Sequence, residues 1–199
     1  MPRASADDAA RTARSIVDTA TRLFAETGYA DVALEDVAAA AGVTRGAVYH
    51  HYGSKRGLFT AVVARLQEEV AAAVVAAAEE AGPDAAAQLR AGCLAFLDAV
   101  TDAAAIRTLL VDAPAVIGWA EWRQLDAEHS VVHLREALAA TGLSGALLDP
   151  LTAMLSGAMN DAALWLAEHP ADPAAREAAR LSLAVLVDAA VARGAAGRP

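Results

Sequence analysis

Between Val37 and Leu58 the sequence carries residue types that contact nucleic acid, spaced as if on one short helix. The outward positions of that helix combine small, basic and aromatic groups, which are Arg45, Gly46, Ala47, Tyr49 and His50. A guanidinium can bond a base edge and small side chains permit close approach, so this combination suits a DNA groove. No Asp or Glu lies between Asp36 and Glu68, and a surface without carboxylates favours contact with phosphates. The basic residues of the same stretch are Arg45, His50, His51, Lys55, Arg56 and Arg65.

The same residues also allow less specific interpretations. A stretch rich in Ala and Gly can form an ordinary helical hairpin, and each polar side chain can be solvated surface. Lys55 is the only lysine in the chain, which suits a special role but follows equally from a composition that favours arginine. The choice depends on the elements that would hold these side chains.

Two short helices joined by a tight turn, followed by the start of a third helix, would position them. Ala38 and Gly42 are spaced i, i+4, so a small residue lets the helices approach while a glycine supplies the turn conformation. Val48 follows six residues later and can fill the angle between the helices. Thr44 can cap the second helix, because its hydroxyl can accept from free backbone N–H groups. The spacing therefore predicts a helix-turn-helix.

Residues Arg14 to Phe59, about a quarter of the chain, resemble the DNA-binding domain of the tetracycline-repressor (TetR) family of bacterial transcriptional regulators. Many positions agree at fixed spacing, which makes the resemblance specific. The matching residues are Ile16, Ala20, Leu23-Phe24, Gly28-Tyr29, Asp36-Val37-Ala38, Ala41-Gly42-Val43, Thr44-Arg45-Gly46-Ala47-Val48-Tyr49, His51-Tyr52, Ser54-Lys55 and Leu58-Phe59.

The resemblance implies a role for each residue of the second helix. Thr44 begins it, and Arg45, Gly46 and Ala47 match the end where the family reads base edges; Arg45 could pair with a guanine. Tyr49 and His50 would flank the groove, while His51 and Lys55 match positions that hold phosphates. Val48 and Tyr52 are expected to face the core.

The sequence departs from the family just before the first helix of the motif. The family usually carries Ser or Thr there, to cap the helix and touch a phosphate, whereas this chain has Val32 and Ala33. Asp31 could supply the cap, but its carboxylate would repel DNA, so that phosphate contact is not expected here.

Composition points to an all-α protein of 199 residues, because 56% of the residues are hydrophobic, alanine dominates and only 5% are aromatic. We expect a helix-turn-helix DNA-binding domain at residues 1–58 and, joined by a long helix, a regulatory and dimerisation domain at 59–199. The further predicted helices are Asp8–Thr27 (ended by Gly28), one from near Leu34, Ser54–Ala81 (stopped by Gly82-Pro83), Asp84–Val100, one from Asp102 or a neighbour broken by Pro114, Ala115–Ala140, Leu147–His169 and Asp172–Arg193, with a frayed tail at Gly194–Pro199.

The net charge of −9 argues at first against DNA binding. Residues 1–60, however, hold seven basic and seven acidic residues, and the remainder holds nine basic and eighteen acidic ones. The acidic part would repel DNA and orient the neutral part towards it.

Several classes of site and location are not expected. One cysteine, Cys93, allows neither an internal disulfide nor a cysteine zinc site, and its apolar surroundings predict an inert buried thiol. His129 and His133 are spaced i, i+4 but lack a definite third metal ligand, so no metal or cofactor is expected. Met1 to Ala13 does not read as a signal peptide, and the apolar run Val70–Ala78 is too short to cross a bilayer, so we expect a cytoplasmic protein with no membrane partner.

The resemblance further implies a small-molecule site and a homodimer formed through the last two long helices. Their apolar stripes are Leu151, Met154, Leu155 and Ala158, and Leu181, Ala184, Val185 and Val191; burial within one subunit would explain them equally. A pocket would need apolar and aromatic lining with a few polar anchors. The candidates, each of which could instead be plain core, are Phe96, Trp119, Trp122, Met154, Met159, Asn160 and Trp165.

The combined expectation is a homodimeric regulator, most often a repressor in this family, that binds a palindromic double-stranded DNA operator and is released by a small-molecule effector. The alternatives are a helical enzyme or a protein-binding adaptor with an incidental helix-turn-helix. The sequence shows no Gly-rich phosphate loop and no nucleophile with a base at recognisable spacing, so no enzymatic activity is expected.

Overall fold

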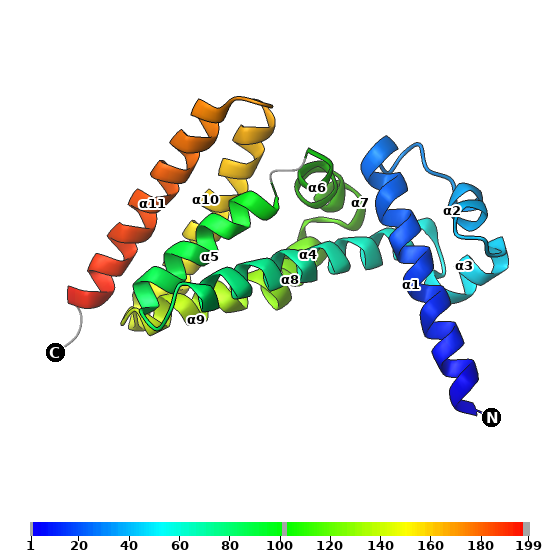
Figure 1. The fold of residues 1–199 in the computed structure, drawn as a ribbon, viewed down its shortest axis with the longest axis horizontal. Coiled ribbons are helices and arrows are strands. Elements are labelled where there is room, and N and C mark those ends of the chain that lie inside the picture. Colours follow the sequence, from blue (N-terminus) through cyan, green and yellow to red (C-terminus); the bar gives the residue numbers. More distant parts are fainter. Residues whose placement is uncertain (1, 101–102, 197–199) are drawn as a thin grey trace. The chain divides into compact units, whose positions relative to one another are not determined.

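The computed structural model describes residues 2–100 and 103–196, and every regular element within them is helical (Figure 1). The predicted all-α class is therefore confirmed for the described chain. The α-helices are α1 Pro2–Thr27, α2 Leu34–Ala40, α3 Arg45–Tyr52, α4 Lys55–Glu80, α5 Ala85–Ala99, α6 Ala103–Ile106, α7 Ala113–Ile117, α8 Trp119–Asp126, α9 Val132–Ala140, α10 Leu148–Ala167 and α11 Pro173–Ala196. Two π-helical turns, η1 Arg107–Asp112 and η2 Ala127–Val131, and a 3-10 turn, η3 Gly145–Leu147, lie between them.

The chain divides into two compact units. The head unit comprises Met1–Leu66 and Arg107–Trp122, and the body unit comprises Gln67–Ile106 and Arg123–Pro199. Arg107–Trp122 thus clusters with the N-terminal helices, although it lies in the middle of the stretch expected to form the regulatory domain. The division at residue 58 stays a prediction.

The head unit is built on the apolar stripe of α1. Ile16, Ala20 and Phe24 are fully buried, and the Phe24 and Phe59 rings meet edge to face with centroids 5.1 Å apart. Tyr29 joins them, with its ring centroid 4.8 Å from that of Phe59. Since α2 and α3 both pack on α1, this core fixes the helix-turn-helix from behind.

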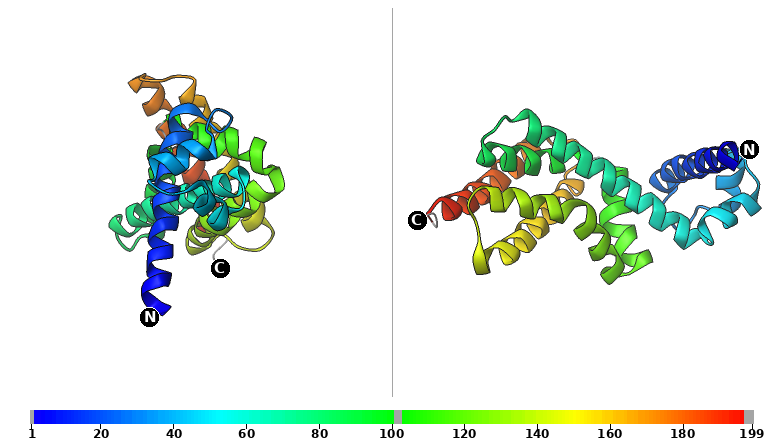
Figure 2. Two further views of the ribbon diagram at one scale, coloured as in Figure 1. Left: turned by 90° about the vertical axis from the view of Figure 1, so that its right-hand side faces the viewer. Right: turned by 90° about the horizontal axis from the view of Figure 1, so that it is seen from below.

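The body unit is a bundle in which α5, α9, α10 and α11 contact one another (Figures 1 and 2). Its core contains Leu97, Leu138, Leu183 and Val187, each no more than 2% exposed. Asp84 caps α5, as predicted, because its carboxylate accepts from the Ala87 N–H at 2.9 Å.

Several predicted helix boundaries are wrong. The first helix begins at Pro2 rather than Asp8, and the last continues through Ala196 where a frayed tail was expected. Of the predicted start at Asp102 or a neighbour, Asp102 lies outside the described residues, and Ala103 next to it is the first residue of α6. Leu147 belongs to a 3-10 turn, and the helix that follows it ends at Ala167, not His169.

Pro114 does not break the helical path as predicted. It lies in the first turn of α7, directly after the π-helical turn η1, and the helical path continues through it. The interruption falls instead at Gly118, whose φ of +88° ends α7 and separates it from α8.

Candidate functional site

The second helix of the predicted motif forms as expected. The Thr44 hydroxyl accepts from the Ala47 N–H at 3.2 Å and caps α3, and Gly42 adopts φ +67° in the turn before it. Val48 is fully buried, so the helix is fixed by one face. The opposite face leaves Arg45, Gly46, Tyr49 and His50 exposed and Ala47 half-buried. The structure therefore brings the candidate base-reading residues together on one open surface.

Arg45 is held in place by two neighbours. One of its terminal nitrogens lies 2.6 Å from Glu35 Oε1 on α2, and the other donates to the Tyr49 hydroxyl at 3.2 Å. The guanidinium also lies over the Tyr49 ring, 5.1 Å from its centroid. The hydrogen bond with Tyr49 and then the charge of Glu35 raise the pKa of Arg45, so the side chain stays cationic.

Sequence reasoning missed Glu35. The stretch after Asp36 is free of carboxylates, but Glu35 comes from the preceding helix and reaches the first residue of α3 across the turn. No helical spacing rule pairs positions ten residues apart, so the contact depends on the packing of α2 against α3.

The C-terminal end of α3 is tied to α1. Half-buried Tyr52 donates its hydroxyl to the Ala13 carbonyl at 2.7 Å. Burial and then the charge of Asp18 raise the pKa of Tyr52, so this hydroxyl keeps its proton. Val48 and Tyr52 thus pack inward, as expected, while half-buried His51 lies with its ring 5.5 Å from that of His50.

Lys55 opens α4 and is already engaged within the head unit. Its ammonium donates to the Ala30 carbonyl at 2.9 Å and lies over the Tyr29 ring, 4.5 Å from the centroid. An ammonium has three donors, so this bond leaves two for a phosphate.

The cap expected from Asp31 is wrong. The residue before α2 is Ala33, and its N–H donates instead to the Asp36 carboxylate at 3.2 Å. Asp36 can do this because it lies in the first turn, where its charge also favours the positive end of the helix.

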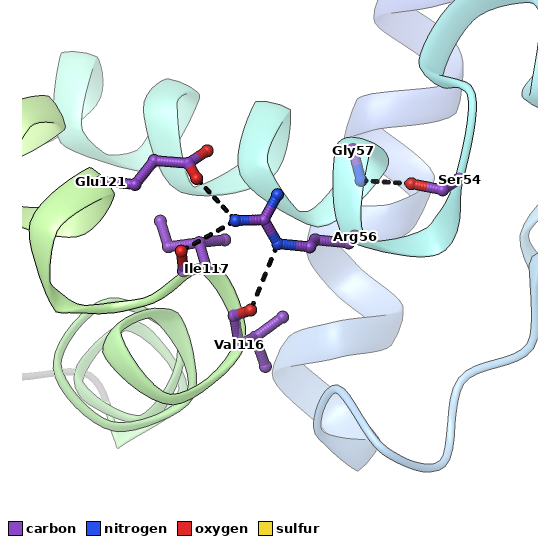
Figure 3. A network of polar contacts seen from close by, with 6 residues as sticks. All are labelled: Ser54, Arg56, Gly57, Val116, Ile117 and Glu121. Atoms are coloured by element: carbon purple, nitrogen blue, oxygen red, sulfur yellow. Dashed lines mark hydrogen bonds and ion pairs between the residues drawn. The ribbon is translucent and has the colours of Figure 1, made fainter.

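Arg56, next to Lys55, joins α4 to the inserted segment Arg107–Trp122 (Figure 3). The same terminal nitrogen donates to the Ile117 carbonyl at 2.8 Å and lies 2.6 Å from Glu121 Oε2. The Arg56 Nε–H also donates to the Val116 carbonyl at 3.4 Å. These carbonyls belong to the last turn of α7, where a cation satisfies free acceptors and complements the helix dipole.

The same segment is anchored at its other end. The Tyr29 N–H donates to Asp112 Oδ2 at 3.4 Å, and Arg107 Nε lies 3.5 Å from the same oxygen. Polar contacts at two places, Arg56 on α4 and Tyr29 after α1, therefore hold Arg107–Trp122 on the helix-turn-helix head.

The body unit contains a cavity of about 320 Å³ between α4, α5, η2, α9 and α10. Of the seven predicted ligand residues, Phe96 and Met159 line it, and both are buried. Its apolar lining includes Val74, Leu89, Cys93, Phe96, Leu134 and Met159, and its polar lining is Glu79, Gln88, Ser130, His133 and Glu136.

The other five predicted ligand residues are not brought to this cavity. Trp119 and Trp122 belong to the head unit; Trp122 is buried and donates its indole N–H to the Leu109 carbonyl at 2.8 Å, whereas Trp119 is 65% exposed. Their rings do lie together, with centroids 4.9 Å apart, as the i, i+3 spacing predicts. Met154 is 69% exposed, half-buried Asn160 does not line the cavity, and Trp165 borders a separate groove between α10 and α11.

Other features of the described residues bear on metals and membranes. His129 and His133 lie beside an open groove, and no group of three or more potential metal ligands occurs within residues 2–100 and 103–196. Over the same residues, no helix combines the length and apolarity that a bilayer crossing requires. Burial raises the pKa of Cys93 to about 12, which fits the inert thiol expected from its apolar surroundings.

Comparisons with known proteins identify both parts of the chain. Residues 16–62 match the family described as "Bacterial regulatory proteins, tetR family", and residues 86–190 match "Tetracyclin repressor-like, C-terminal domain". The second match alone covers more than half of the chain.

Individual curated proteins that match part of this chain are also transcriptional regulators. The HTH-type transcriptional regulator AcrR of Shigella flexneri is 42% identical over 62 residues, which are 31% of this chain and 29% of that protein. The HTH-type transcriptional repressor Rv1474c of Mycobacterium tuberculosis is 42% identical over 62 residues, 31% of this chain and 33% of its own. These matches thus span only about a third of the length of the curated relatives.

A solved structure extends the likeness to nearly the whole chain. The crystal structure of a TetR-family transcriptional regulator from Pectobacterium atrosepticum superposes with a TM-score of 0.67 at 30% identity, covering 92% of both chains. This family consists of DNA-binding regulators, not enzymes. With a matching helix-turn-helix, a matching C-terminal domain and a matching overall structure, the chain belongs to the TetR family of transcriptional regulators.

Proposed function

We propose that this regulator is a homodimeric repressor that binds a palindromic operator and leaves it when a small molecule occupies the body cavity. The observation that carries the proposal is the face of α3: Arg45, Gly46 and Tyr49 are exposed beside a Thr44 cap, on a helix anchored by fully buried Val48. One curated relative that matches this region is itself named a repressor.

Base reading is assigned to Arg45, Gly46 and Ala47. A guanidinium can make two parallel hydrogen bonds to guanine, and the small neighbours permit approach to a thymine methyl. Tyr49 both orients Arg45 and, with His50, faces the groove wall. His51 and Lys55 are assigned to phosphates, with Thr44 at the start of the helix next to the backbone.

Glu35 places a negative charge next to the surface assigned to DNA. Its carboxylate would face DNA phosphates, so it disfavours unspecific binding, while its bond to Arg45 holds the guanidinium in a defined orientation. The head unit carries nine basic and nine acidic residues, so its affinity for DNA comes from local placement and not from net charge.

Dimerisation is assigned to α10 and α11. Their exposed apolar side chains are Met154, Trp165, Leu181, Val185 and Leu186. A groove bordered by Trp165, Leu183 and Leu186 lies between the two helices and can receive side chains of a second copy. Leu155, by contrast, is buried within its own subunit and drops out of the predicted dimer stripe. Two copies would present two recognition helices to half-sites about 34–36 Å apart.

Effector coupling is assigned to the inserted segment Arg107–Trp122. Contacts of Arg56 and Asp112 hold this segment on the head. The residues that precede and follow the segment in the sequence belong to the body unit. Residues of η2 and α9, which come shortly after the segment in the chain, line the body cavity. An effector that favours another arrangement of this segment would change operator affinity, and operator would change effector affinity equally, typically by about 1–3 kcal/mol.

The test begins with selection of an operator from random-sequence duplex DNA. Binding of the selected site is then measured over a salt series for the wild type, Arg45→Lys, Tyr49→Ala and Lys55→Ala, with Arg22→Ala as a control that removes a cation on α1 instead. Arg45→Lys should relax sequence preference because a lysine lacks the bidentate fork. Lys55→Ala should lower the salt slope by about one and weaken all sequences alike.

Two results would contradict the proposal. A protein-binding adaptor would show no selectable site, and Tyr49→Ala and Lys55→Ala would leave its activity intact. If the operator binds but Val185→Glu leaves the chain dimeric in sedimentation, with Arg176→Glu on the same helix as control, the assignment of α11 to the dimer interface fails.

A further inference from the structure

The body cavity has an apolar interior, and exposed carboxylates lie at its opening. Its interior is apolar, and Phe96 contributes an aromatic ring. The polar residues that line it are two carboxylates, Glu79 and Glu136, together with the Ser130 hydroxyl, the Gln88 amide and the His133 imidazole. One of the two N–H donors of the Gln88 amide is already used, because it donates to the Gly82 carbonyl at 2.7 Å.

An open groove of about 450 Å³ continues from this cavity. The two share Ala71, Val75, Glu79 and His133, so they adjoin along one side of α4. The groove adds two more carboxylates, Glu68 and Glu128. A ligand that enters the cavity by this route passes four exposed carboxylates in all.

Few positive charges along this path could offset the four carboxylates. Among the described residues that line the cavity and the groove there is no lysine or arginine. The imidazole of His133 lies 4.0 Å from Glu136 Oε2, the nearest approach to a cationic partner that this lining offers. The body unit as a whole carries sixteen acidic and seven basic residues, so its field attracts cations towards the same opening.

We infer that the effector is a lipophilic cation: a compound with an apolar body that fills the cavity and an ammonium or similar cationic group that stays at the acidic opening. This inference rests on the proposed function, because it names the ligand class of the proposed effector site. The apolar body is stabilised by burial against residues such as Phe96 and Met159. The cation interacts with Glu79 and Glu136, whereas a carboxylate ligand would be repelled by both.

The experiment compares three probes that share one alkyl chain. Decyltrimethylammonium, decan-1-ol and decanoate, each below its micelle concentration, are titrated calorimetrically into the full-length protein. Two exposed carboxylates at the opening give an expected preference of about tenfold for the cation over the alcohol, with decanoate weaker still. The preference should shrink as salt rises, because exposed charges are screened.

Charge-neutral variants locate the effect. Glu79→Gln and Glu136→Gln should each weaken the cation by roughly two- to fivefold and leave the alcohol unchanged. Glu80→Gln is the matched control, because Glu80 is the exposed neighbour of Glu79 but does not line the cavity or the groove. All three variants change surface residues, so a folded protein is expected in each case.

The inference is overturned if decan-1-ol or decanoate binds as tightly as the cation, if none of the probes binds, or if Glu80→Gln costs as much as Glu79→Gln. Operator binding is measured in the same samples. If the cation binds with the expected preference and the operator stays bound, the ligand class stands and the release mechanism proposed above fails.

Discussion

Replacing Arg56 with alanine should loosen the segment Arg107–Trp122 from the head. Arg56 contributes one hydrogen bond of 2.8 Å to the Ile117 carbonyl, a longer one of 3.4 Å to the Val116 carbonyl, and an ion pair of 2.6 Å with Glu121 (Figure 3). The variant removes all three and leaves the last carbonyls of α7 to water.

The size of the effect follows from exposure. The Arg56 and Glu121 side chains are 52% and 42% exposed, so their ion pair contributes at most about 1 kcal/mol after solvent screening. The part-buried hydrogen bond to the Ile117 carbonyl adds about 1 kcal/mol, less than is usual for a charged donor because the Arg56 side chain is half exposed. The loss of about 1–2 kcal/mol should make local opening of the segment about five- to thirtyfold more frequent.

Hydrogen exchange read by mass spectrometry measures this opening directly. Peptides covering residues 113–122 should exchange about five- to thirtyfold faster in Arg56→Ala, while peptides of α3 stay close to wild type because Thr44 and Val48 still hold that helix. Glu121→Gln should show a smaller change, since only the ion pair is weakened. Arg56→Lys should be intermediate because one ammonium cannot serve all three acceptors.

Arg22→Ala is the control for removal of a surface arginine. Arg22 pairs with Glu26 on the same helix, 3.5 Å away. If residues 113–122 exchange at the same rate in Arg56→Ala and Arg22→Ala, the Arg56 contacts do not hold the segment, and the proposed route from effector to operator loses its anchor on α4.

Three further perturbations have defined outcomes. Thr44→Ala should lower the free energy of unfolding of the head by about 1 kcal/mol in urea titrations, because the Ala47 N–H loses its cap, whereas Thr44→Ser should not. Cys93, with its pKa raised by burial to about 12, should react with a thiol reagent at pH 8 more than about tenfold slower than free cysteine until the protein is denatured. Burial raises the pKa of the Asp126 carboxyl group despite its contact with Arg123. The folded state therefore binds the carboxyl proton more tightly than the unfolded state does. As a result, the free energy of unfolding of the wild type should rise as the pH falls through the raised pKa of Asp126. Asp126→Asn should therefore be at least as stable as wild type near pH 7 and lose that advantage below the raised pKa.

Each of these has a result that contradicts it. Equal unfolding curves for Thr44→Ala and Thr44→Ser would mean that the cap contributes nothing. Labelling of the native thiol as fast as free cysteine would mean that Cys93 is accessible. An Asp126→Asn protein that is clearly less stable at pH 7 would mean that the Arg123 contact outweighs the burial of the charge.

Local patterns in the sequence determined the helices and the motif. The periodic stripe of Ile16, Ala20 and Phe24, the cap at Thr44 and the caps of later helices are short-range effects, so their positions can be predicted without knowledge of the fold. The error at Pro114 also has a local cause. Pro114 follows a π-helical turn that continues the helical path, and only Gly118, with its positive φ, interrupts it.

Tertiary packing decided which distant residues meet. Glu35 reaches Arg45 across a turn, Arg56 reaches Ile117 and Glu121 sixty or more residues away, and Trp122 joins the head although its position in the chain suggested an effector pocket. The sequence predicts Phe96 and Met159 as lining residues, but not the carboxylates that line the same cavity. Helix formation depends on neighbours within one or two turns, whereas these contacts depend on how whole helices pack, and no spacing in the sequence encodes that directly.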